Sequence, residues 1–187
     1  MEMFHFKSPA EFRQWLAENH ARADGIWLRL FKRTSGEPSI THAEALDQAL
    51  CFGWIDGQLK PLDERSWLRK FTPRRPQSGW SKLNTRHIER LTAAGAMTPA
   101  GLIAVAAART DGRWAAASDS PRDAVPPADL LKALARDKQA AAFFATLNRA
   151  NVYAIVYRLQ TAKKPEPRQR RLAAILKMLS QGKAFHP

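Results

Sequence analysis

The alternation of apolar and polar side chains divides the chain into a mixed N-terminal region and a helical C-terminal region. Residues 25–33 alternate as a strand does, with Ile26, Leu28 and Leu30 on one side. Residues 54–59 and 66–71 alternate again around a polar, turn-like segment. We therefore predict a small antiparallel sheet of about three strands, which is near the minimum for independent stability.

Capping signals predict helices packed with this sheet. Ser8 is followed three residues later by Glu11, and Thr41 by Glu44, which is the spacing of a capping box. A further helix is expected over residues 81–94, because Gly95 is a natural stop. The region is therefore predicted to be an α+β module.

The C-terminal region shows helical spacing only. An apolar i, i+3, i+4, i+7 stripe runs from Leu172 to Leu179. Residues 111–127 are rich in Ala, Ser, Asp and Pro, which is typical of a linker. We predict an α+β module over 1–110, a linker over 111–127 and a helical hairpin or bundle over 128–187.

Charge is concentrated in two segments. The chain has 30 basic and 17 acidic residues, for a net charge of +13. Residues 58–90 hold nine basic and three acidic side chains, and residues 158–187 hold eight and one. Such clustering is the footprint of an anionic partner, such as nucleic acid or a phosphorylated ligand. A solvated face that only aids solubility explains the same pattern.

Several function classes lack their sequence signals. The five histidines show no metal-ligand spacing, and no phosphate-binding glycine motif occurs, so we expect no metal or cofactor. The single cysteine, Cys51, lies near a helix C-terminus and is expected to be a buried, inert thiol. No signal peptide and no run of about 18 apolar residues is present, so we expect a cytoplasmic protein without a transmembrane segment.

Aromatic residues and cations interleave along the segment that runs from the second predicted strand, through the third, to the helix that follows. Trp67, Arg69 and Phe71 share one strand face by their period of two. Aromatic rings that stack on bases, with cations along the phosphates, are how proteins hold single-stranded nucleic acid. In the opposing interpretation the rings fill the core and the arginines are merely solvated. The candidate ligand-binding residues are Trp54, Asp56, Arg69, Arg74, Arg75, Trp80, Ser81, Lys82, Asn84 and Arg86.

Asp56 is unusual because carboxylates are depleted in strands. It could pair with Arg69 or Lys60, or act as an acid or base if it is buried. His42 is assigned to the start of its helix. It lies about 13 Å along the helix axis from Cys51, so we do not expect it to act as a base for the Cys51 thiol. We name no catalytic residue and expect a binding protein rather than an enzyme.

Several motifs together carry a family resemblance. They lie at residues 39–45, 51–57, 71–75, 80–84 and 97–101, at Phe143-Phe144, and at 162–166 with Arg168, Arg170 and Arg171. In these motifs the chain resembles the YdeI/OmpD-associated family, also described by bacteriocin protection. The resemblance implies a terminal helical domain and a protein partner in stress or bacteriocin tolerance.

Three functions follow as alternatives. The first is a non-catalytic binder of an anionic partner, nucleic acid or a phosphorylated ligand, through a basic-aromatic face. The second is a small-molecule-binding protein or enzyme with a pocket around Asp56 and Arg74. The third is the interaction protein that the resemblance implies.

Overall fold

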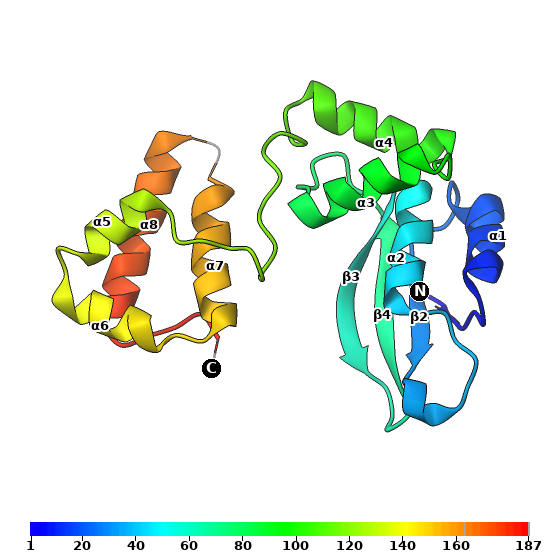
Figure 1. Cartoon of the computed structure of the whole chain (residues 1–187), viewed down its shortest axis with the longest axis horizontal. Helices are drawn as coiled ribbons and strands as arrows, with labels where there is room; N and C mark the ends of the chain where they lie inside the picture. The colour runs from blue at the N-terminus through cyan, green and yellow to red at the C-terminus, as the bar shows by residue number, and fades with distance from the viewer. Residues whose placement is uncertain (163, 187) are drawn as a thin grey trace. The chain divides into compact units, whose positions relative to one another are not determined.

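The computed structural model describes residues 1–162 and 164–186 (Figure 1). The chain divides into two compact units. The N-terminal unit comprises Met1–Gly79 and Asn84–Ala115, and the C-terminal unit comprises Trp80–Leu83 and the chain from Ala116 onward. The N-terminal unit combines helices with a sheet and the C-terminal unit is helical, so the predicted α+β class is confirmed.

The sheet has four strands, so the prediction of about three was wrong. The strands are β1 (Met3–Phe4), β2 (Ile26–Phe31), β3 (Trp54–Pro61) and β4 (Ser66–Pro73). Their order is β1-β2-β4-β3, with β1 parallel to β2 and the other pairs antiparallel. Strand β1 was missed because two residues are too few to show an alternation and no turn signal joins them to β2.

Two helices begin at the predicted caps. The Ser8 hydroxyl accepts a hydrogen bond from the Glu11 amide, and Thr41 and Glu44 form a complete capping box. The helices of the N-terminal region are α1 (Pro9–Asn19), α2 (His42–Cys51), α3 (Lys82–Ala93) and α4 (Pro99–Thr110), with a 3₁₀ turn η1 (Arg33–Ser35).

The two faces of the sheet have different surroundings. The register pairs Ile26 with Phe71, Leu28 with Arg69 and Leu30 with Trp67, so these side chains share one face. Helices α1 and α2 cover this face, since the ring of Phe12 contacts that of Phe71 at 5.7 Å and α2 packs on β3. We call it the covered face and the opposite one the open face.

A β-bulge alters strand β3. Its register to β4 shifts between Asp56 and Leu59, where Asp56 pairs with Phe71 and Leu59 with Arg69. Both Asp56 and Leu59 therefore lie on the covered face, although an odd number of residues separates them.

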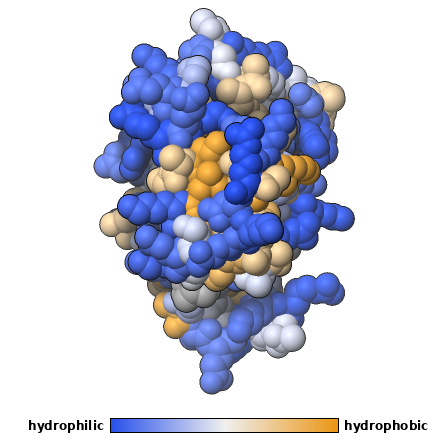
Figure 2. Space-filling model, turned by 90° about the vertical axis from the view of Figure 1, so that its left-hand side faces the viewer, coloured by the Kyte–Doolittle hydropathy of each residue, from blue (hydrophilic) through white to orange (hydrophobic). Residues whose placement is uncertain are grey.

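The C-terminal unit has a core of its own. Four helices supply it: α5 (Ala128–Leu134), α6 (Lys138–Thr146), α7 (Arg149–Gln160) and α8 (Pro165–Ser180). The hydrophobic core cluster consists of the buried residues Leu130, Leu134, Ala140, Ile155, Leu159, Ile175 and Leu179. The buried amide of Asn151 accepts hydrogen bonds from the Phe185 and His186 amides, which holds the last described segment against α7. On the face that Figure 2 draws, hydrophilic residues surround a smaller hydrophobic area.

Candidate functional site

The predicted ligand-binding residues are divided between the two units. Trp54, Asp56, Arg69, Arg74, Arg75, Asn84 and Arg86 belong to the N-terminal unit, whereas Trp80, Ser81 and Lys82 belong to the C-terminal unit. Each group is described within its own unit.

Asp56 and Arg69 form an ion pair on the covered face. Oδ2 of Asp56 accepts hydrogen bonds from Arg69 Nε at 3.0 Å, from Arg69 Nη2, and from His42 Nε2 at 2.9 Å. The carboxylate side chain is only 14% exposed. Burial by itself would raise the pKa of Asp56, but the hydrogen bonds and charges of His42 and Arg69 outweigh it, so the pKa lies below its ordinary value.

This cluster confirms one of the two partners predicted for Asp56, namely Arg69. The contact with His42 was missed, because His42 stands at the first position of α2 and 14 residues before Asp56. Only the packing of α2 on β3 brings the two side chains together.

Trp54 and Phe71 are core residues. Trp54 is 1% exposed, its indole N–H donates to the His20 carbonyl at 3.1 Å, and its ring meets that of Trp15 edge-on at 5.8 Å. Phe71 is fully buried. These two rings therefore fill the core and are not platforms for stacking.

Two arginines hold the loop after β4. Arg74 Nη1 donates to the Gly79 carbonyl at 2.8 Å, and Arg113 Nη1 donates to the Ser78 carbonyl at 2.9 Å. Burial lowers the pKa of Arg74 to about 10; the positive charge of Arg113 adds to this effect, and the charge of Asp56 opposes it. Both guanidinium groups are therefore used to position the loop that carries Arg75 and Ser78.

Beside this loop the open face is hollowed. The hollow has a volume of about 380 Å³ and is lined by Ile55, Gly57, Gln58, Lys70, Thr72, Pro73, Arg75 and Ser78. Two of these side chains are cationic, three carry neutral polar groups and none is acidic. We call it the basic depression.

Helix α3 carries Lys82, Arg86 and Arg90 at i, i+4 and i+8, and two of these three cations are paired with carboxylates. Lys82 pairs with Asp119 at 2.6 Å within the C-terminal unit, and Arg90 pairs with Asp47 at 2.7 Å within the N-terminal unit. Arg86 is exposed and has no ion pair among the residues that the structure describes. Asn84, on the same helix, is half-buried.

Trp80 and Ser81 are tied to the segment predicted as a linker. The Trp80 carbonyl accepts a hydrogen bond from the Ser118 amide at 2.9 Å, and Ser81 forms an isolated parallel bridge with Ser118. The Trp80 side chain is 3% exposed. Both residues therefore make structural contacts within the C-terminal unit.

The basic cluster near the C-terminus is also partly paired. Arg168 Nε and Nη2 donate to the two carboxylate oxygens of Asp129 at 2.8 and 2.9 Å, and Arg171 donates to the Arg158 carbonyl at 2.7 Å. This pairing offsets the cost of positive charge at the start of α8. Lys163 of the same motif lies outside the described residues.

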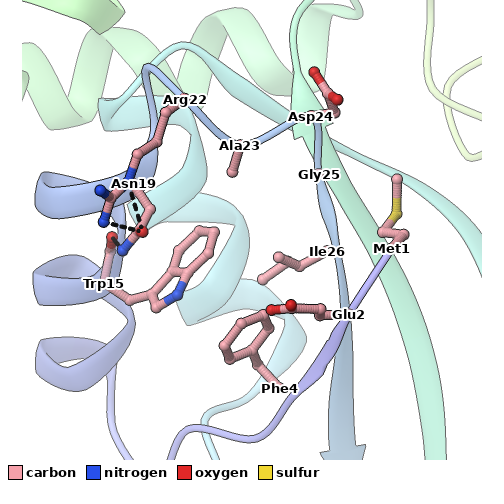
Figure 3. A pocket seen from close by; sticks show the side chains of 10 residues that line it. All are labelled: Met1, Glu2, Phe4, Trp15, Asn19, Arg22, Ala23, Asp24, Gly25 and Ile26. Atoms are coloured by element: carbon pink, nitrogen blue, oxygen red, sulfur yellow. Dashed lines mark hydrogen bonds between the residues drawn. The ribbon is translucent and has the colours of Figure 1, made fainter.

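A larger pocket lies between α1, the loop that follows it and the first two strands (Figure 3). It has a volume of about 540 Å³, and Trp15, Phe4 and Ile26 provide apolar surface. Arg22 stands on one side, bonded to Asn19, while Glu2 and Asp24 stand on the other. Its mixed charge suits an anion less well than the basic depression does.

Among the residues that the structure describes, no group of three or more His, Cys, Asp or Glu side chains could hold a metal ion, and no helix combines the length and apolar character that a membrane span requires. Cys51 is fully buried, as predicted, and burial raises the pKa of its thiol.

Two known families match the chain. A domain of unknown function, DUF8412, matches residues 4–104, and the family described as "Bacteriocin-protection, YdeI or OmpD-Associated" matches residues 123–182. The motifs noted over 39–57, 71–84 and 97–101 lie within the first match. No curated protein and no solved structure matches the chain. The chain thus belongs to the DUF8412 family, which covers more than half of its length, and carries a YdeI/OmpD-associated domain after it.

Proposed function

We propose that the N-terminal unit is a non-catalytic binder of single-stranded nucleic acid, held at the basic depression on the open face. The observation that carries the proposal is the lining of the depression, in which Lys70 and Arg75 stand among neutral polar groups and no carboxylate. Cations without an acidic neighbour remain available to phosphates, which supply most of the affinity in such complexes.

An aromatic ring lies beside Lys70. Trp27 is paired in register with Lys70, so both side chains stand on the open face. The ring of Trp27 is half-buried, and the Lys60 ammonium lies over it at 4.6 Å from its centre. A base can stack where Lys60 now lies, and the displaced ammonium can pair with a phosphate.

The test is fluorescence anisotropy of the full chain with labelled single-stranded RNA and DNA at several salt concentrations. We expect a linear loss of log affinity with log salt, and a slope that falls by about 0.7 in each of Lys70→Ala and Arg75→Ala. Lys7→Ala is the matched control, since Lys7 is an exposed cation of the same unit outside the depression.

Three outcomes would contradict this proposal. Binding that does not depend on salt would exclude phosphate contacts. Equal losses in Lys7→Ala and Lys70→Ala would show that net charge, and not the depression, attracts the strand. Absence of binding at low salt would favour a small phosphorylated ligand at the same residues.

A second function concerns the C-terminal unit, because the family matched there is described by bacteriocin protection. We propose a protein partner for it. Leu131 and Tyr157 are large apolar side chains exposed on this unit, at 49% and 41%. If the proposal holds, cells that lack the chain are more sensitive to a bacteriocin. The double variant Leu131→Asp, Tyr157→Asp then fails to restore tolerance, whereas the control variant Lys70→Ala restores it.

A further inference from the structure

A small pocket opens on the covered face, on the opposite side of the sheet from the basic depression. It has a volume of about 120 Å³ and is lined by Leu30, His42, Leu59, Trp67 and Arg69. The residues come from all three long strands and from the start of α2. The space equals about four water molecules, which suits a small ligand or the end of a larger one.

Hydrogen-bond donors of the lining remain unused. Nε and Nη2 of Arg69 donate hydrogen bonds to Asp56, whereas its Nη1 makes no hydrogen bond within the described residues. The Trp67 indole N–H is covered from solvent and also has no partner there. Buried polar groups are nearly always hydrogen-bonded, so an unpaired N–H beside a pocket points to an acceptor that the protein itself does not supply.

The rest of the lining is apolar. Leu30 is 1% exposed and closes the pocket, while Leu59 is 53% exposed at its mouth. Asp56 is not part of the lining and is already bonded to His42 and Arg69. The pocket therefore offers donors and apolar surface with no acidic group, and this combination selects an anionic acceptor with a short apolar tail.

We propose that this pocket binds a small aliphatic carboxylate. Its two oxygens accept from the free Arg69 Nη1 and, once the Trp67 ring turns its covered indole N–H into the pocket, from that N–H. Its tail packs between Leu30 and Leu59. The proposal does not depend on nucleic-acid binding at the open face.

The test is a titration of the ¹⁵N-labelled full chain with sodium isobutyrate, monitored at the Trp67 indole N–H resonance. Trp67→Phe assigns that resonance by its disappearance. We expect a saturable shift with a Kd of about 1 mM, ordinary for a ligand of about six non-hydrogen atoms. Isobutyramide has the same shape without the charge, and we expect it to bind about tenfold more weakly.

A pair of exposed leucines supplies the matched control. Leu59→Asp places a negative charge at the mouth of the pocket and should weaken isobutyrate binding about tenfold. Leu62 is 42% exposed and lies outside the pocket, so Leu62→Asp should leave the Kd within about twofold. Lys70→Ala should also leave it unchanged, which separates this site from the open face.

Two results would overturn the proposal. One is a shift that grows linearly with isobutyrate and does not saturate, because that indicates weak contact with the whole surface. The other is an equal loss of binding in Leu59→Asp and Leu62→Asp, because only the first residue lines the pocket.

Discussion

The two faces of the N-terminal sheet place neighbouring cations in opposite circumstances. On the covered face, Arg69 is partly buried. Its guanidinium forms an ion pair with Asp56 and donates two hydrogen bonds to that carboxylate. The next residue, Lys70, points to the open face and lines a depression that contains no carboxylate. Side chains of a strand alternate, so a single step along the chain leads from a cation paired with a carboxylate to one that is not.

This difference shows why the charge of a segment does not locate a binding site. Residues 58–90 carry most of the basic surplus of the N-terminal unit. Arg69, Arg74 and Arg90 of that segment are engaged with partners inside their own unit. Lys70 and Arg75, which the pleat and the loop turn toward the open face, have no ion pair among the described residues.

The largest expected effect comes from breaking the ion pair on the covered face. Asp56→Ala leaves the guanidinium of Arg69 partly buried and unpaired, which should lower the free energy of unfolding by about 3 kcal/mol in urea titrations. Glu37→Ala is the control, because Glu37 pairs with Arg65 at 2.8 Å where both side chains are exposed. That loss should stay below about 1 kcal/mol, and similar losses in both variants would erase the distinction between the pairs.

A glycine pair provides the next contrast. An added Cβ at Gly101 would fall on the Cys51 carbonyl, where α4 meets the end of α2. Gly101→Ala should therefore destabilise the protein by about 2 kcal/mol. A Cβ at Gly57 would meet the Lys70 Cβ at 3.7 Å and the Lys70 carbonyl oxygen at 3.8 Å, both ordinary contacts, so Gly57→Ala should change the unfolding free energy by less than about 1 kcal/mol. Differential scanning calorimetry distinguishes the two, and equal melting temperatures would refute the close helix contact.

The ion pair should also respond to acid. The pKa of Asp56 is lower in the folded state, so the unfolded state binds more protons and stability rises with pH in that range. The contribution is complete above the unfolded pKa of about 4 and is lost as the pH falls through the folded value. Urea unfolding between about pH 5 and 2 should therefore show a steeper loss in the wild type than in Asp56→Asn.

The comparison of the wild type with Asp56→Asn is needed because other carboxyl groups behave in the same way. Hydrogen bonds lower the pKa of Glu44, Asp63, Asp119 and Asp129 as well. Parallel curves for the two proteins would mean that Asp56 contributes nothing to the acid response.

The smallest effect is expected on the open face. Lys60→Ala removes the ammonium from the Trp27 ring, and we expect a loss of about 0.5 kcal/mol in unfolding free energy. Lys32→Ala removes an exposed lysine without a ring contact among those described and should be neutral. A loss above about 1.5 kcal/mol in Lys60→Ala would show that this lysine is part of the structure and not free to meet a ligand.

Local patterns predicted much of the N-terminal unit. The strands over 25–33, 54–59 and 66–71 and both caps were found from alternation and capping residues. The shared face of Trp67, Arg69 and Phe71 followed from the same period and is confirmed by the register. The pair of Asp56 and Arg69 was one of two partners considered, because both residues stand on neighbouring strands.

The remainder of the site involves residues distant in sequence. The bulge after Asp56 brings Leu59 to the covered face, and no residue pattern marked it. The contact of His42 with Asp56 depends on the packing of a helix on a strand. The basic depression depends on Arg74 and Arg113 holding one loop, although their positions are 39 residues apart in the chain.

Patterns among neighbouring residues were enough to predict the α+β class, the caps, the period of the strands and the concentration of positive charge, because each depends on residues within a few positions. Which face of the sheet is covered, which cations are neutralised and where the pockets open became known only from the folded chain. Those properties depend on burial and on partners brought together across the sheet, and a strand pattern is the same whichever of its faces the helices cover.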